Sequence, residues 1–164
     1  MKPLTALGGG LAGACAVTLI HETVRRIVPE APRMDLLGMN AISKGLAAAG
    51  MEKPDENKLF TWALAADVVS NSLYFSLAGL GKEKNAWLKT SLLGLGAGIG
   101  AVLLPGPLGL DEKHSNKTVA TKLMTIGLYL AGALVTTAVM KALEKREEKR
   151  NERWQERLVT SAMV

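Results

Sequence analysis

Residues 59–81 read LFTWALAADVVSNSLYFSLAGLG, an apolar run long enough to cross a bilayer as a helix. One charged residue, Asp67, stands near its middle. Polar residues of the run recur at i, i+3, i+4 and i+7, so a helix would place them on one face. These residues are Asp67, Ser70, Asn71 and Tyr74. The stretch therefore predicts a membrane span that carries a polar stripe.

Three other apolar runs lie outside this stretch, and the composition suits a bilayer. Hydrophobic residues make up 48% of the chain, aromatic residues only 4%, and there are 17 glycines. A soluble core usually contains more large aromatic side chains, whereas helices in a bilayer pack through small residues. We expect an all-α, polytopic integral membrane protein with a four-span domain, 1–143, and a charged helical tail, 144–164. The predicted spans are about 4–28, 59–80, 86–104 and 119–143.

The first apolar run also allows a second interpretation, a secretory signal peptide, because LAGAC resembles a cleavage region. Two features favour a span instead. Ala12 stands where a lipoprotein signal normally has a larger aliphatic residue, and the apolar run continues past Cys15. Pro29 and Pro32 then end the helix.

The connections between the spans are short and polar. In 29–58, four apolar residues fall roughly on one helical face, which predicts a short amphipathic helix at the membrane surface or against a partner. They are Leu36, Met39, Ile42 and Leu46. The tight turn after the second span favours an antiparallel hairpin with the third. No glycine or proline follows Gly132, so the last helix can continue into the tail, as a solvated extension or a docking helix.

Glycines recur within the predicted spans and would let a second helix approach closely. The predicted packing positions are Gly9, Gly13, Gly94, Gly96, Gly98, Gly100 and Gly127. Three residues, Gly96, Gly98 and Ala101, also match G-x-G-x-x-A. A dinucleotide site needs a strand before that motif, and here an apolar helix surrounds it, so no cofactor is expected.

Polar side chains also gather where the first span ends: His21, Glu22, Arg25 and Arg26. Glu22 can pair with either arginine at helical spacing. The sequence HETVRR lacks the second histidine of a zinc hydrolase motif, and the chain has one cysteine and two histidines, so no metal site is expected. His21 is then an interfacial anchor or a proton acceptor.

The net charge is +5; seven of the twenty Lys and Arg lie after Met140, mixed with Glu, and most of the others flank apolar runs. We therefore expect a lipid bilayer as partner and no nucleic acid. Four spans would place both termini on one side, together with eleven of the twenty Lys and Arg. Because basic residues favour the cytoplasmic side, we expect a bacterial inner membrane protein with both termini in the cytoplasm.

No nucleophile motif or phosphate-binding loop is present, so an enzyme is not favoured. We expect a structural or accessory component that forms a homo-oligomer or joins a larger membrane complex through its glycine-rich faces. The alternative is a small oligomeric channel or transporter that uses the stripe around Asp67, because a carboxylate at bilayer depth faces protein or water. A third hypothesis is a membrane enzyme that acts on a lipid through His21, Glu22 and Asp67.

Overall fold

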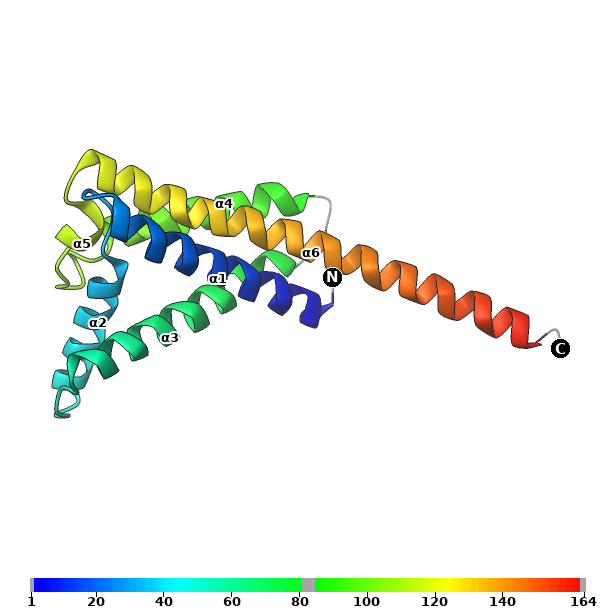
Figure 1. The fold of residues 1–164 in the computed structure, drawn as a ribbon, viewed down its shortest axis with the longest axis horizontal. Helices are drawn as coiled ribbons and strands as arrows, with labels where there is room; N and C mark the ends of the chain where they lie inside the picture. The colour runs from blue at the N-terminus through cyan, green and yellow to red at the C-terminus, as the bar shows by residue number, and fades with distance from the viewer. Residues whose placement is uncertain (1, 81–84, 163–164) are drawn as a thin grey trace.

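The computed structural model describes residues 2–80 and 85–162, and every regular element in these residues is helical (Figure 1). The prediction of an all-α chain is confirmed for them. The elements are α1 (Pro3–Ile27), α2 (Met34–Ala48), α3 (Glu56–Ser76), the 3-10 turn η1 (Leu77–Gly79), α4 (Ala86–Leu103), α5 (Lys113–Asn116) and α6 (Val119–Ala162).

Three helices, α1, α4 and α6, are long and apolar enough to cross a membrane. They begin within one residue of three of the predicted spans. The remaining predicted span, 59–80, falls on α3. This helix is not among the three, because Asp67, Asn71 and three serines lower its mean hydropathy. Apolar helices that can span a membrane are therefore confirmed, and a fourth span stays a prediction.

Local sequence explains where the helices start and stop. Pro3 occupies the first turn of α1, where its missing N–H costs no hydrogen bond. The side chain of Asp55 caps α3 by accepting a hydrogen bond from the backbone N–H of Lys58 at 3.0 Å. Gly50 adopts a positive φ of 69° in the turn after α2, a conformation that favours glycine.

The long helices pack in the order α3, α1, α6, α4, which differs from their order in the chain (Figure 1). We predicted that the second and third spans pair as a hairpin. Their helices, α3 and α4, run in opposite directions, but α3 packs mainly on α1 and α4 mainly on α6. The turn residues 81–84 lie outside the described part of the chain.

Small residues let α1 and α6 approach closely. A Cβ atom on Gly13 would overlap the side chain of Thr136 and lie 2.6 Å from the backbone oxygen of Gly132. A Cβ atom on Gly132 would in turn overlap Val17. Neither position has room for a side chain, so both glycines set the distance between the two helices.

The core beside this crossing is apolar, with Val17, Phe75 and Ala133 buried together. Buried hydroxyl groups within it are satisfied locally: Thr136 and Thr137 donate to the carbonyl oxygens one turn earlier in α6, at 2.9 and 3.3 Å. This matters because an unpaired hydroxyl in an apolar layer would cost stability.

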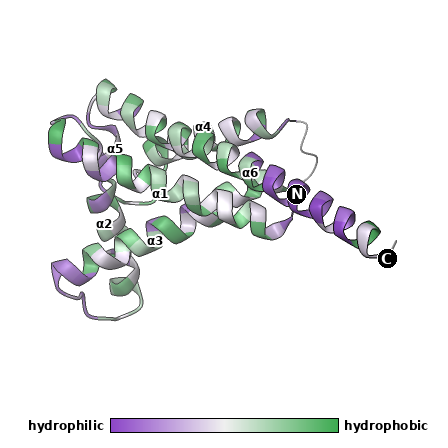
Figure 2. Ribbon diagram, turned by 45° about the vertical axis from the view of Figure 1, so that its right-hand side comes forward, coloured by the Kyte–Doolittle hydropathy of each residue, from purple (hydrophilic) through white to green (hydrophobic). Residues whose placement is uncertain are grey.

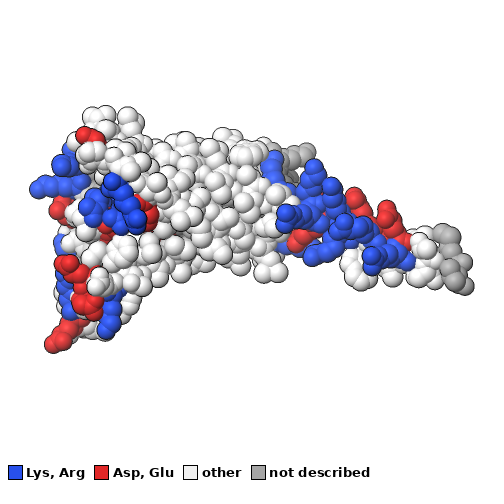
Figure 3. Space-filling view, in the orientation of Figure 1, with Lys and Arg blue, Asp and Glu red and all other residues white. Residues whose placement is uncertain are grey.

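Hydropathy and charge divide the molecule along its length. In Figure 2, α1, α4 and the first half of α6 are largely apolar, and the second half of α6 is hydrophilic. Figure 3 shows one face on which charged side chains gather at the α2 end and where α6 leaves the other helices, with an uncharged belt between. Such a belt is typical of a surface that contacts hydrocarbon.

Helix α2 occupies the connection in which a short helix was predicted, and it packs on α3. Its one buried residue is Leu37, whereas the four residues of the predicted apolar face are half-buried. Lys44 on α2 also donates a hydrogen bond to the carbonyl oxygen of Gly109. The helix is therefore held by protein contacts on two sides, and its amphipathic role at a membrane surface stays a prediction.

Candidate functional site

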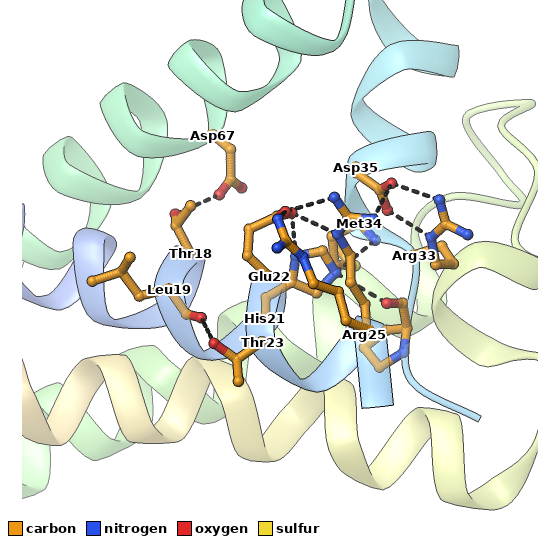
Figure 4. A network of polar contacts seen from close by, with 12 residues as sticks. Thr18, Leu19, His21, Glu22, Thr23, Arg25, Arg33, Met34, Asp35 and Asp67 are labelled. Carbon is orange, nitrogen blue, oxygen red and sulfur yellow. Dashed lines mark hydrogen bonds and ion pairs between the residues drawn. The ribbon is translucent and has the colours of Figure 1, made fainter. Parts of the chain in front are cut away.

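The two predicted polar clusters, one on α1 and one on α3, lie next to each other in the structure (Figure 4). Helices α1 and α3 pack side by side, which brings the last turns of α1 to the middle of α3. The start of α2 covers the end of α1 and adds further charged residues. A single polar region therefore joins three helices.

Asp67 points toward α1 and is bonded on both oxygens (Figure 4). The Thr18 hydroxyl donates to Oδ2 at 3.2 Å, and the Asn71 amide donates to Oδ1 at 2.9 Å. Within residues 2–80 and 85–162, no lysine or arginine lies within ion-pair distance of this carboxylate. Asp67 is therefore held by neutral donors.

Two small cavities adjoin Asp67 on different sides. One, of about 20 Å³, lies toward α2, and the other, of about 10 Å³, lies toward α6. Each is close to the 10–15 Å³ or so that one water molecule requires. Both are lined by His21, Met34 and Asp67, with Glu22 lining the first and Tyr129 the second. Each of these two cavities therefore has room for about one water molecule beside the Asp67 carboxylate.

The predicted stripe on α3 does not act as a unit. Asp67 and Asn71 are bonded to each other, as its spacing suggests. Ser70 is exposed and donates to the backbone oxygen of Asp67 at 3.2 Å. Tyr74 points to α4 instead, where its hydroxyl donates to the carbonyl oxygen of Leu93 at 3.0 Å. Asp67 and Asn71 thus form one pair, and Ser70 and Tyr74 each make a separate contact.

His21 is 6% exposed and holds the turn between α1 and α2. Its Nε2 atom lies 3.0 Å from the carbonyl oxygen of Pro32, to which it donates when protonated. The same atom lies 3.3 Å from the backbone nitrogen of Met34, whose N–H it accepts when it is not protonated. Either tautomer therefore fixes the turn, a role that matches an anchor more directly than a proton acceptor.

A chain of alternating charges connects α1 and α2 (Figure 4); its members, in order, are Glu22, Arg25, Asp35 and Arg33. Arg25 donates from Nε and Nη2 to the two oxygens of Glu22, at 2.7 and 2.6 Å. Its Nη1 atom also lies 3.6 Å from Oδ2 of Asp35. Arg33 donates to both oxygens of Asp35, at 3.0 and 2.7 Å. Two guanidinium groups thus balance two carboxylates.

Arg26, the fourth residue of the predicted interfacial cluster, contributes less. Its side chain is 72% exposed, and its Nη2 atom lies 3.7 Å from Glu22. An exposed pair at that distance contributes little to stability. The structure therefore brings together His21, Glu22 and Arg25 and leaves Arg26 at the surface.

Electrostatic interactions keep Asp35 and Arg33, at the α2 end of this series of ion pairs, ionised. Burial alone would raise the pKa of Asp35, whose side chain is 5% exposed. The hydrogen bonds from Arg33, and the charges of Arg33 and Arg25, outweigh burial and lower that pKa below its usual value. The hydrogen bond to Asp35 correspondingly raises the pKa of Arg33. The pair therefore stays charged at neutral pH.

The predicted glycine positions divide into two groups. In the first, a Cβ atom would lie closer than 3 Å to an atom of α6; this group is Gly9, Gly13, Gly94 and Gly98. In the second, the surroundings are open. A Cβ atom on Gly96 or Gly100 would make only ordinary contacts at 3.5 Å, and one on Gly127 would meet nothing within 4 Å.

Three contributors to the polar region were not predicted from the sequence: Thr18, Asp35 and Tyr129. Thr18 precedes His21 by three residues, so helical spacing alone could have added it to the same face. Asp35 follows the two prolines that redirect the chain, and its contact with Arg25 depends on that turn. Tyr129 reaches the cavity by the packing of α6 on α1, for which the sequence holds no local signal.

The chemistry available to this region follows from its partners. A carboxylate beside a histidine, in a space for single waters, can exchange a proton or join helices by hydrogen bonds. Among the described residues, no group of three or more His, Cys, Asp or Glu side chains is arranged to hold a metal ion. The sequence matches no protein-family model, and no curated protein or solved structure is significantly similar to the chain.

Proposed function

We propose that this chain is a four-span membrane protein, with α3 as the additional span, and that it is a structural or accessory component of a larger membrane complex. The observation that carries the accessory role is the length of α6. It has 44 residues and is therefore about 66 Å long, roughly twice the thickness of a hydrocarbon core. The C-terminal part of this helix extends past the apolar helices (Figure 1).

The exposed side chains of α3 support its role as a span. Val69 and Leu73 on α3 are each 59% exposed, and Leu77 in the adjoining turn η1 is 48% exposed. Such exposure would be unfavourable in water and favourable in lipid. A central Asp is expensive in lipid, at roughly 2.5–3.5 kcal/mol. That cost falls when the group faces protein, and Asp67 faces Thr18.

The alternative of a channel or transporter has one observation in its favour, the contact of Asp67 with two small cavities. Against it, the core beyond Asn71 is apolar, and Phe75 and Met140 are fully buried there. Balanced ion pairs also occupy the end of the polar region nearest α2. These features favour a structural role for the interior. We therefore assign the contacts with partners to the outer surface and the tail.

Glycine-mediated association would have to use the outer surface, because four of the predicted glycines already contact α6 of the same chain. The tail offers a different contact. Trp154 and Leu158 are i, i+4 neighbours and are each 58% exposed. Isolated helices are marginally stable in water, and apolar residues at this spacing insert into grooves of partner proteins. We therefore infer that the tail docks a protein partner through these two side chains.

The orientation that we propose keeps the tail in the cytoplasm. Eleven of the twenty Lys and Arg belong to the side of Lys2 and the tail when four helices cross the membrane. Basic residues near span ends favour the cytoplasmic side. The bacterial inner membrane is the proposed location.

A cysteine-labelling experiment tests the number of spans. In a Cys15→Ser background, we expect Lys2→Cys and Gln155→Cys to react with an impermeant maleimide from one side of sealed vesicles, and Glu52→Cys from the other. Four crossings require this pattern, because both termini then share a side. Labelling of Lys2→Cys and Gln155→Cys from opposite sides would show three crossings and remove α3 from the membrane.

A native-gel experiment tests the accessory role. After gentle solubilisation of native membranes, we expect the parent chain to migrate in a complex and Trp154→Ala/Leu158→Ala to migrate as a single chain. Two lost anchors remove most of an apolar docking contact. Val159→Ala, which truncates another exposed tail residue, is the matched control and should stay in the complex. A parent chain that migrates alone would contradict the proposal.

A further inference from the structure

A cleft of about 520 Å³ separates the start of α1 from the part of α6 that leaves the other helices. Its walls combine apolar and basic side chains: Leu4, Thr5, Leu143, Arg146, Glu147, Lys149, Arg150 and Arg153. We propose that this cleft binds the phosphate-bearing headgroup of an anionic phospholipid. The inference uses the proposed membrane placement and is independent of the protein partner.

Charge in the cleft is strongly one-sided. Its four cations, Arg146, Lys149, Arg150 and Arg153, recur at helical spacing and share one face of α6. The one carboxylate, Glu147, is already paired with Lys2 at 3.1 Å. Within the described residues, no ion pair joins the four cations to a carboxylate. The cleft is therefore built for an anion supplied from outside the chain.

The type of basic residue in the cleft indicates which class of anion would bind. Three of the four are arginines, whose guanidinium groups donate two parallel hydrogen bonds to phosphate oxygens. Clusters of basic residues directly after a membrane helix also attract anionic lipids. A phosphodiester fits both features.

The position of the cleft favours a lipid over free phosphate. Figure 3 shows the basic residues of α6 at the edge of the uncharged belt, where headgroups would lie. Leu4 lines the cleft and is 79% exposed, and Leu7 on the same helix is 46% exposed. These apolar side chains suit the acyl chains of a lipid and have no counterpart in an inorganic ion.

Native mass spectrometry of the full chain in mild detergent tests the proposal. We expect phosphatidylglycerol to stay bound and phosphatidylcholine, whose headgroup is neutral overall, to dissociate. Arg146→Gln/Arg150→Gln should weaken the retention of phosphatidylglycerol on the order of tenfold. The matched control, Lys122→Gln/Lys145→Gln, removes the same charge from residues of α6 that do not line the cleft, and should retain the lipid.

Three results would overturn the inference. Equal retention of both lipids would show no headgroup selection, and equal losses in the two double variants would reduce the effect to net charge. Displacement of phosphatidylglycerol by millimolar inorganic phosphate would assign the cleft to a free ion. The four substituted residues are all exposed on α6: Lys122, Lys145, Arg146 and Arg150. The circular dichroism and elution volume of each variant should therefore match those of the parent chain and keep the comparison valid.

Discussion

Gly13→Leu is expected to separate α1 from α6 and to lower the thermal unfolding midpoint in mild detergent by roughly 10 °C or more. The Cβ atom alone would lie 2.6 Å from the backbone oxygen of Gly132. A backbone atom cannot rotate away, so the helices must move apart. That movement would open the buried contacts of Val17, Phe75 and Ala133. Fluorescence-detected size-exclusion chromatography after heating measures the shift.

Gly127→Leu provides the matched control on α6. No atom lies within 4 Å of the position that its Cβ would occupy, and replacing a helical glycine gains up to about 1 kcal/mol. We expect its midpoint to equal or exceed that of the parent chain. Thr136→Ala in the Gly13→Leu background should rescue only partly, because it removes the side-chain overlap and leaves the backbone contact. An unchanged midpoint for Gly13→Leu would refute this account of the packing.

The helices could be predicted from the sequence because their signals are local. Continuous apolar runs predict α1, α4 and α6 within a few residues. Pro29 and Pro32 mark the end of α1, and α6 continues because no glycine or proline follows Gly132. The order of packing could not be predicted. The short turn after α3 favoured a hairpin, but α3 packs on α1 and α4 on α6, through contacts between residues far apart in the chain.

The polar region was predictable only in part, for a similar reason. Asp67 with Asn71 and Glu22 with Arg25 are pairs within single helices, and their spacing predicts them. Thr18 with Asp67 and Arg25 with Asp35 join different helices. Such pairs depend on how one helix is rotated and shifted against another, which a single sequence does not encode in any local pattern.

Contacts between different helices also show that Arg25 is the charged residue that stabilises the junction of α1 and α2. Arg25 is 18% exposed and contacts carboxylates on both helices, Glu22 at 2.6 Å and Asp35 at 3.6 Å. Its guanidinium group also lies 5.8 Å from the centre of the Phe60 ring on α3. One side chain therefore connects three helices, and its removal would leave two carboxylates without their shared cation.

Arg25→Met is accordingly expected to lower the unfolding free energy on the order of 3 kcal/mol, as the loss of one member of a buried ion pair does. The exposed fractions of Glu22 and Asp35, 17% and 5%, mean that water screens the remaining repulsion poorly. Glu22→Gln/Arg25→Met should recover much of the loss, because it removes the unpaired charge as well. Thermal unfolding of the single and double variants in the same detergent measures both effects.

Arg26→Met separates this effect from a simple loss of positive charge. Arg26 is the next residue in the chain, carries the same charge and lies 3.7 Å from the same carboxylate, but its side chain is 72% exposed. Water and mobile ions already screen it, so we expect its loss to change stability by at most about 0.5 kcal/mol. Equal destabilisation by Arg25→Met and Arg26→Met would mean that burial does not decide the contribution of these arginines, and that the ion-pair chain does not hold α1 to α2.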